Sequence, residues 1–260
     1  IAVISPSGQL LHQWMKGYTV MAICPDRDGQ LLAGTYRDGL FRIDPRTGRE
    51  QQLTRGQRIG SITLDGKGNI YTAVFNDGLH SYTPDGKTER LLCKGRLKLT
   101  NPYLNRLFTA RDGKIWIGHY YGVDVYDPQT DSMVDVSIHE ALRPAIVYTI
   151  EQSPRDRSIW VGTNKGLFQY HTRGTAKGTW KRFTTKNGLP NDIVCGIVVT
   201  DDGTLWASTY RGLAEIDADG TFTSYYRGNG LQEWSYLRGV YTWTGIDEVL
   251  LGNLGGITYF

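Results

Sequence analysis

The chain has 260 residues, 40% of them hydrophobic and 12% aromatic, so it can bury a large core and is not a disordered segment. Its 29 Lys and Arg exceed its 26 Asp and Glu by three, with no run of five like charges, so we expect no contact with nucleic acid. No apolar stretch reaches the roughly 18 residues of a membrane span. The first residues lack the charged start and cleavage site of a signal peptide, so we expect the sequence to begin inside a longer protein.

Three cysteines, Cys24, Cys93 and Cys195, are an odd number at spacings that suit neither a metal site nor a disulfide framework. We expect them to be small buried apolar side chains. The 32 glycines, 16 tyrosines and 7 tryptophans favour strands and turns over helices.

Six segments of the chain align as strand, tight turn, strand. In chain order they are GQLLAGTYRDGLFRID from Gly29, GNIYTAVFNDGLHSYT from Gly68, GKIWIGHYYGVDVYD from Gly113, RSIWVGTNKGLFQYH from Arg157, GTLWASTYRGLAEID from Gly203 and DEVLLGNLGGITYF from Asp247. One aromatic or leucine position recurs in them, at Leu32, Tyr71, Trp116, Trp160, Trp206 and Leu250, giving intervals of 39, 45, 44, 46 and 44 residues. This regularity indicates a structural repeat.

Each repeat contains two more apolar runs. One precedes the aligned segment, at 20–24, 61–64, 106–110, 147–150, 195–199 and 239–243, and another follows it, as at 179–185 and 221–226. Four short strands with a period in the low forties are typical of a propeller blade. The sequence therefore predicts an all-β fold, a β-propeller of four-stranded antiparallel blades.

Glycines and other small residues recur where strands of the repeat approach closely or turn sharply. A small residue two positions after the aromatic one recurs at Gly34, Ala73, Gly118, Gly162, Ser208 and Gly252, where we expect strands to approach closely. A glycine in the following turn recurs at Gly39, Gly78, Gly122, Gly166, Gly212 and Gly256, where it permits positive φ.

The two ends of the sequence are incomplete repeats. The opening IAVISPSG matches LFRIDPRTG at 40–48, so Ile1 begins a third strand, and the chain ends at the third strand of its last repeat. We expect one β-propeller domain over 1–260, with six motif copies and an N-terminal half-blade. That half-blade either completes the sixth blade or is the remainder of a seventh.

The repeat at 157–170 strongly resembles the two-component regulator propeller repeat, with Arg157 in place of its first glycine. The resemblance covers essentially the whole chain, although Leu32 and Leu250 replace the aromatic residue and Val74, His119 and Asn253 replace a threonine. It implies the periplasmic sensor region of a Bacteroidetes hybrid two-component regulator, with seven blades per propeller. The tail 229–260 looks like the blade that leads into an immunoglobulin-like domain, which implies a second propeller.

The same resemblance implies partners and a location for the parent protein. They are a neighbouring propeller, the immunoglobulin-like domain, a second copy in a homodimer, and a membrane helix that leads to a histidine kinase. The domain itself is then expected in the periplasm, attached to the membrane only through its parent.

Ligand-binding candidates lie where the second strand turns into the third and where one blade links to the next, because these loops emerge on one face. The candidates are Tyr36, Arg37, Phe75, Asn76, Tyr120, Tyr121, Asn164, Lys165, Tyr210, Arg211, Trp234 and Arg238. Aromatic rings stack on sugars, and Asn, Arg and Lys donate hydrogen bonds, so an oligosaccharide or another protein domain suits them. Alternatively, many of them only pack between blades.

The opposite face contains DRDG at 26–29, which superficially resembles a calcium loop. It lacks the downstream bidentate glutamate, so we interpret it as a turn and predict neither a metal nor a cofactor.

An enzyme would need paired acid and base groups, and propellers also host lyases. Acids on the candidate face are few, and His119 beside Tyr120 is the best lone candidate for proton transfer, although a packed histidine is more common. No nucleophile elbow, phosphate loop or zinc motif appears. We therefore expect no catalytic residues and rank a sensor first, a structural interaction propeller second and a lyase-like enzyme third.

Overall fold

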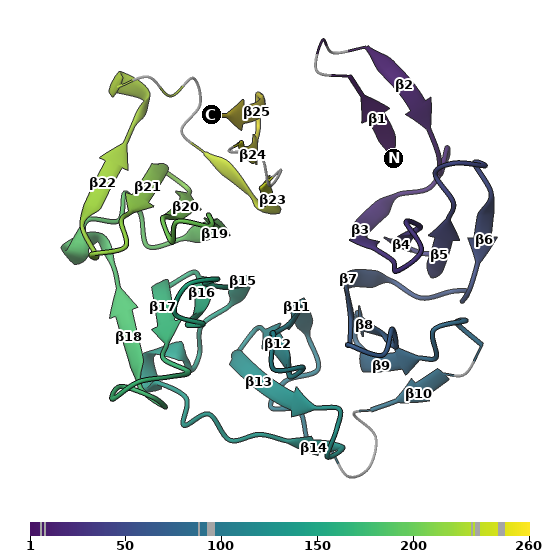
Figure 1. Cartoon of the computed structure of the whole chain (residues 1–260), viewed down its shortest axis with the longest axis horizontal. Helices are drawn as coiled ribbons and strands as arrows, with labels where there is room; N and C mark the ends of the chain where they lie inside the picture. The colour runs from purple at the N-terminus through teal and green to yellow at the C-terminus, as the bar shows by residue number, and fades with distance from the viewer. Residues whose placement is uncertain are drawn as a thin grey trace. The chain divides into compact units, whose positions relative to one another are not determined.

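The computed structural model describes residues 1–5, 7, 9–87, 89–92, 97–229, 231, 235–243 and 248–260. Within this part the fold is all-β, and every sheet is made of strands that follow one another in the chain (Figure 1). The described helices are three short 3-10 turns, η1 (Glu140–Leu142), η2 (Thr185–Asn187) and η3 (Arg227–Asn229).

Five sheets have four strands, one has three and one has two. The two-stranded piece pairs β1 (Ala2–Ile4) with β2 (Leu10–Gln13). Blade 1 is β3 (Val20–Pro25), β4 (Leu31–Thr35), β5 (Leu40–Ile43) and β6 (Glu50–Gln52), and blade 2 is β7 (Ile59–Leu64), β8 (Ile70–Val74), β9 (Gly78–Tyr82) and β10 (Glu89–Leu91). Blade 3 is β11 (Leu104–Thr109), β12 (Ile115–His119), β13 (Gly122–Asp127) and β14 (Ser132–Met133).

The remaining blades follow the same order. Blade 4 is β15 (Val147–Gln152), β16 (Ile159–Thr163), β17 (Gly166–Tyr170) and β18 (Trp180–Phe183). Blade 5 is β19 (Val194–Val199), β20 (Leu205–Thr209), β21 (Gly212–Ile216) and β22 (Phe222–Tyr225), and blade 6 is β23 (Tyr236–Trp243), β24 (Val249–Asn253) and β25 (Gly256–Tyr259). The predicted propeller of six motif copies with an N-terminal half-blade is confirmed.

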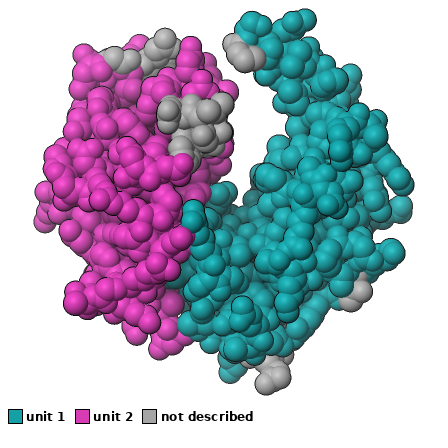
Figure 2. Space-filling view, in the orientation of Figure 1, with its two compact units in different colours: residues 1–117, 125–134 teal, residues 118–124, 135–260 magenta. Residues whose placement is uncertain are grey.

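The chain divides into two compact units (Figure 2). The first contains residues 1–117 and 125–134, and the second contains residues 118–124 and 135–260. Blades 1 and 2 belong to the first unit and blades 4, 5 and 6 to the second, whereas blade 3 contributes to both. A single domain over 1–260 stays a prediction.

In blades 1, 3 and 4, the small residue of the second strand packs against the first strand of the following blade. A Cβ on Gly34 would lie 2.6 Å from Cγ2 of Ile59, the first residue of β7. A Cβ on Gly118 would collide with Cγ1 of Val147, the first residue of β15. These contacts explain the recurrent small residue, because any larger side chain would push neighbouring strands apart.

The glycine that opens each third strand meets two demands at once. Gly39 and Gly166 have φ values of 88° and 114°, which side chains disfavour. A Cβ on Gly39 would also lie 2.5 Å from the carbonyl oxygen of Thr54, and one on Gly166 would collide with that of Phe183. The third strand therefore starts pressed against the end of the fourth.

The recurrent aromatic position lies in the cores of the separate units. In the first unit, the ring of Tyr71 lies 6.2 Å from that of Tyr126 inside a buried cluster. In the second unit, Trp160 stacks at 5.6 Å on Phe183, whose ring lies 5.5 Å from that of Phe222. Each of these contacts joins strands of one blade or of successive blades.

Tyr241 on β23 links three blades of the second unit. Its hydroxyl accepts a hydrogen bond from Thr149 Oγ1 at 2.6 Å and donates one to Glu151 Oε1 at 3.0 Å, both on β15. The ring crosses β19 at Gly196, where a Cβ would lie only 2.7 Å from Cδ1 of Tyr241.

Aspartates of the turns between the first and second strands hold backbone amides. Asp202 Oδ1 accepts from Thr204 N at 3.0 Å and from Thr200 Oγ1 at 2.5 Å, and these bonds, the Thr200 hydroxyl foremost, lower the carboxyl pKa. Asp26, in the segment that resembles a calcium loop, accepts from Arg42 Nε at 2.8 Å.

We predict that Gly162→Ala will lower the free energy of unfolding by about 1–3 kcal/mol, because the added Cβ collides with Thr149 Cγ2 and lies 2.8 Å from Val194 Cγ1. Gly60→Ala is the matched control, since a Cβ there meets nothing within 4 Å. It should change stability by less than about 0.5 kcal/mol. Urea unfolding midpoints measure both, and equal midpoints would contradict the packing argument.

Candidate functional site

In four blades, one backbone hydrogen bond recurs at the end where the second strand turns into the third. In blade 1, Tyr36 N donates to Thr19 O at 2.9 Å, and in blade 2, Phe75 N donates to Arg58 O at 2.9 Å. Blades 4 and 5 repeat it with Asn164 N to Ile146 O and Tyr210 N to Ile193 O, both at 3.1 Å. Within a blade, these bonds join the turn after the second strand to the link before the first strand, and we call this combined surface the loop face.

Threonines fix the conformation of three of these turns. The hydroxyls of Thr35, Thr163 and Thr209 donate to the carbonyl oxygen of the glycine that opens the third strand, at 2.8–2.9 Å. The same hydroxyls accept from the amides of Asp38, Lys165 and Arg211, at 2.9–3.2 Å. The scaffold therefore sets the turn, and the residues between threonine and glycine carry variable side chains.

In the first unit an arginine lies between two aromatic rings. Arg58 Cζ lies 4.6 Å from the ring centroid of Tyr36 and 4.1 Å from that of Phe75. Arg37 Cζ lies 5.4 Å from the Tyr36 ring, and Tyr103 lies 6.1 Å from the Phe75 ring. We call these five residues the Arg58 stack. Its three rings are 37–44% exposed, so their faces and edges can meet a ligand.

The second unit has a comparable arrangement. Arg238 Cζ lies 4.3 Å from the Tyr148 ring and 5.3 Å from the Tyr210 ring, and Arg238 Nη2 donates to the Tyr210 hydroxyl at 2.5 Å. We call these three residues the Arg238 stack. A register shift between Tyr236 and Tyr241 places extra residues in β23, so Arg238 lies in a bulge, a device that re-aims side chains near functional sites.

Cys195 lies beside the Arg238 stack but is chemically quiet. Burial raises the pKa of its thiol to about 12, although Arg238 opposes the shift, so the thiol is neutral at physiological pH. Cys195 is buried and Cys24 half-buried, and Cys93 lies outside the described residues.

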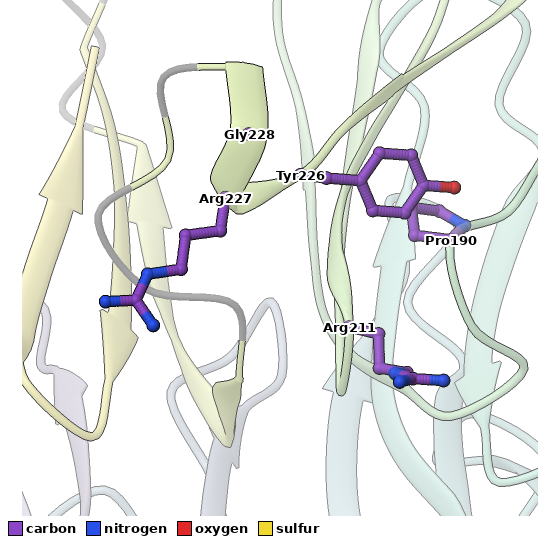
Figure 3. Close-up of a pocket in the computed structure, with 5 residues that line it drawn as sticks. All are labelled: Pro190, Arg211, Tyr226, Arg227 and Gly228. Atoms are coloured by element: carbon purple, nitrogen blue, oxygen red, sulfur yellow. The ribbon is translucent and has the colours of Figure 1, made fainter.

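A pocket of about 300 Å³ opens on the loop face of the second unit. It is lined by Pro190, Arg211, Tyr226, Arg227 and Gly228 (Figure 3). Of these, only Arg211 was predicted from the sequence. Tyr226, Arg227 and Gly228 were missed because they lie beyond the fourth strand, outside the aligned turns.

Other predicted residues contribute hydrogen bonds or turn conformations to the scaffold. Asn164 Oδ1 accepts from Ile146 N at 2.8 Å and so closes the blade 4 link. The Lys165 carbonyl accepts from Arg182 Nε at 2.9 Å and from its Nη2 at 2.7 Å. Asn76 occupies a turn position at φ 62°, which asparagine tolerates.

Tyr120 and Tyr121 are exposed by 45% and 44% in the blade 3 turn. Trp234 lies outside the described residues. Of the predicted residues, Tyr36, Arg37 and Phe75 therefore lie at Arg58 in the first unit, and Tyr210 lies at the predicted Arg238 in the second. A contact of any predicted residue with a ligand stays a prediction.

His119 takes the place of threonine in the blade 3 turn. Its side chain is fully buried, its Nδ1 accepts from Tyr121 N at 3.1 Å, and its Nε2 lies 3.4 Å from Asp124 Oδ2. The candidate for proton transfer therefore supports the turn through the same amide that a threonine would bind.

The ring of His80, on β9, lies beside two carboxylates. Its Nδ1 lies 2.6 Å from Glu89 Oε1 and its Nε2 lies 3.0 Å from Asp77 Oδ2. Glu89 Oε1 also accepts from the Tyr82 hydroxyl at 3.0 Å and from Gln57 Nε2 at 3.0 Å. The bond between His80 and Glu89 joins the third strand of blade 2 to the fourth.

No group of three or more His, Cys, Asp or Glu could hold a metal ion in the described part of the chain. No described helix is long and apolar enough to cross a membrane.

Neither a protein-family model nor a curated protein matches the sequence. Solved structures do match by fold. The extracellular domain of the hybrid two-component system BT3049 from B. thetaiotaomicron superposes with a TM-score of 0.84 at 19% identity, over 97% of this chain and 35% of that chain. The extracellular domain of the one-component system BT4673 from the same organism gives 0.78 at 18% identity, over 97% and 34%.

A lyase also shares the fold. Catalytically inactive virginiamycin B lyase from Staphylococcus aureus, solved with quinupristin, gives a TM-score of 0.74 at 16% identity, over 98% of this chain and 85% of that chain. The chain spans about a third of the two bacterial sensor-system domains that it matches. The likeness to two-component propellers that the repeat predicts is confirmed at the level of the fold.

At position 119, we predict that threonine will give a more stable protein than valine. His119→Thr restores a side-chain acceptor for the Tyr121 amide, whereas His119→Val has the same shape without one. We expect His119→Thr to be more stable by about 1 kcal/mol, the usual net value of such a bond. Urea denaturation of the two variants gives the difference, and equal stabilities would show that the bond is dispensable.

For the Arg58 stack, a double-mutant cycle with Arg58→Ala and Phe75→Ala should give a coupling energy of about 0.5–1 kcal/mol, because Arg58 Cζ lies 4.1 Å from the Phe75 ring in a partly exposed site. Arg58→Ala with Tyr82→Phe is the control pair and should be additive, since Tyr82 instead bonds to Gln57 and Glu89. Additivity in both cycles would contradict a stacked arginine.

Proposed function

We propose that this chain is the ligand-sensing propeller of a periplasmic hybrid two-component signalling protein. In this role it binds oligosaccharide breakdown products on its loop face and thereby controls a histidine kinase and the transcription of glycan-use genes. The observation that carries the proposal is that both units hold an arginine between aromatic rings on this face. The shared fold with extracellular domains of two-component systems supports it.

The chemistry of the two stacks suits sugars. A sugar ring offers apolar faces and many hydroxyls, and exposed rings such as Tyr36, Phe75 and Tyr103 offer flat apolar area at low entropic cost. The arginine fixed between the rings is already oriented, so it loses little freedom when it donates a hydrogen bond. The sites are thus preorganised for a polar ligand with flat apolar patches.

Signalling requires two arrangements of the parent protein. A ligand shifts their populations only by binding one of them more tightly. The loops supply the binding energy for that shift, and the neighbouring domains of the parent, among them a second propeller and an immunoglobulin-like domain in a homodimer, would carry it to the membrane.

One observation favours a packing role alongside ligand binding. The outer strand of the last described sheet, β25, and the turn before it leave Leu254, Ile257 and Tyr259 exposed by 76%, 65% and 74%. Apolar side chains gathered on one strand are typical of a surface that another domain covers. This supports the second candidate, a structural propeller that packs against neighbouring sensor domains.

The lyase-like alternative has less support from the geometry. Its best proton-transfer candidate, His119, is fully buried and bonded to the Tyr121 amide. General acid–base catalysis needs a group that can reach the substrate.

The test is a thermal-unfolding screen of the chain with xylo-, arabino-, fructo- and galacto-oligosaccharides. A ligand bound to the native state at 100 times its Kd adds about 2.7 kcal/mol of stability, so the melting temperature should rise for at least one sugar. The rise should shrink in Arg58→Ala or Arg238→Ala, because each removes the centre of a stack.

Arg46→Ala is the matched control, since Arg46 is an exposed cation in the turn between β5 and β6, away from the loop face. It should keep the full rise. A flat response to every sugar would contradict the sensor proposal, and conversion of a sugar to products would favour the enzyme instead.

A further inference from the structure

The pocket in the second unit combines two cations with a flat apolar wall. Arg227 and Gly228 belong to η3, Tyr226 precedes it, Arg211 lies in the turn before β21, and Pro190 lies in the link before β19 (Figure 3). The Tyr226 ring lies beside Pro190, while the Arg227 side chain extends away from that ring and Arg211 enters from a separate turn (Figure 3).

A glycine makes the apolar wall possible. Gly212 has φ of 128°, and a Cβ there would lie 3.3 Å from Pro190 Cβ and 3.4 Å from Tyr226 Cδ1. The backbone at 212 therefore lies close to both wall residues, and the Tyr226 side chain that forms most of the wall is 46% exposed.

The repeat provides an internal comparison for this pocket. The link after β18 and the link after β22 form the same turn, since Thr184 N donates to Asn187 Oδ1 at 2.9 Å and Tyr226 N donates to Asn229 Oδ1 at 2.8 Å. The backbone bonds from Asn187 N to Thr184 O and from Asn229 N to Tyr226 O also correspond. The two turns can thus be aligned residue by residue.

This alignment shows what is particular to the pocket. Tyr226 and Arg227 stand where the preceding link has Thr184 and Thr185. The turn itself forms equally well with threonines, so its geometry does not require a ring or a guanidinium group at these positions. Exposed aromatic and basic groups that the backbone does not need point to a binding role.

Among the described turns and links that border the pocket, cations outnumber carboxylates. The turns and links of blade 5 that border it, residues 184–193, 210–211 and 226–229, carry Lys186, Arg211 and Arg227. Their one carboxylate, Asp192, accepts from Thr185 N at 2.7 Å. A negative ligand would gain from this field, most strongly at low ionic strength.

We propose that this pocket binds a sugar that carries an anionic group, either a carboxylate or a sulfate. The sugar ring lies against Tyr226 and Pro190, and the anionic group is bound by Arg227 or Arg211, whose guanidinium groups match both oxyanions. The inference rests on the proposed function, since it names the class of glycan that this sensor would take.

The experiment is isothermal titration of the chain with glucuronate, galacturonate and galactose 6-sulfate, and with galactose and sodium sulfate for comparison. We expect binding of at least one acidic sugar, weaker binding of galactose, and a loss of affinity for the acidic sugar as NaCl rises from 50 to 500 mM. The uronates and the sulfated sugar distinguish the two anionic groups.

Three variants and one control test whether the acidic sugar binds in this pocket. The double variant Arg211→Ala/Arg227→Ala and the single variant Tyr226→Ala should each weaken binding of the acidic sugar at least tenfold. Gly228→Phe should block the pocket without strain, because a Cβ at 228 meets nothing within 4 Å and the aligned residue of the preceding link is Lys186. Lys177→Ala, which removes an exposed cation from the turn between β17 and β18, should change affinity less than twofold.

The outcomes separate this inference from the proposed function. If neutral oligosaccharides bind and no acidic sugar does, the sensor proposal stands and this inference is wrong. If acidic sugars bind equally well to wild type, the Arg211→Ala/Arg227→Ala variant and Gly228→Phe, the site lies elsewhere and the inference is also wrong. Binding of sodium sulfate without any acidic sugar would reduce the pocket to an anion site and overturn the sugar assignment.

Discussion

The close approach of consecutive blades at one small residue is the constraint on which this structure depends. Gly34 and Gly118 lie against the first residues of the following blades, at distances that leave no room for a Cβ. The β-branched partners Ile59 and Val147 fill the space instead. Because each blade covers the next in this way, apolar side chains on both faces of a sheet can be buried.

In the same scaffold, the side chains displayed on the loop face are not needed to hold the turns. Threonine hydroxyls at 35, 163 and 209 hold the turns from within, and backbone bonds tie each turn to the link of its own blade. Where a blade lacks threonine, His119 supplies a nitrogen acceptor in its place. The residues displayed between these anchors can vary in chemistry, and in two places they surround an arginine with aromatic rings.

The fold could be predicted from the sequence because the recurrent residues of the repeat meet local conformational requirements. Glycines 39 and 166 need positive φ and contact with a carbonyl, so they recur at one position and reveal the turn. The candidate site was harder to predict. Arg58 and Tyr148 complete the two stacks, but they lie at the start of first strands, where the apolar pattern gives no sign that a side chain turns outwards.

The pocket residues Tyr226 and Arg227 were missed for a related reason. They follow the fourth strand, where links differ in length, and the alignment of the repeat fades there. The hydrogen bonds of Asn187 and Asn229 show that the two links are the same turn. A side chain's chemical role, unlike its backbone conformation, depends on neighbours from other blades, and one sequence does not specify them.

Tyr241 has a consequence for how the second unit behaves as an array. Repeat architectures are usually described by nearest-neighbour terms, in which each repeat interacts only with the one before and the one after. The bonds from Tyr241 to Thr149 and Glu151 pass over β19 and join blade 6 to blade 4. This adds an interaction between next-nearest neighbours to the free energy of the second unit. The three blades therefore open together, and a destabilising change in blade 6 also destabilises blade 4.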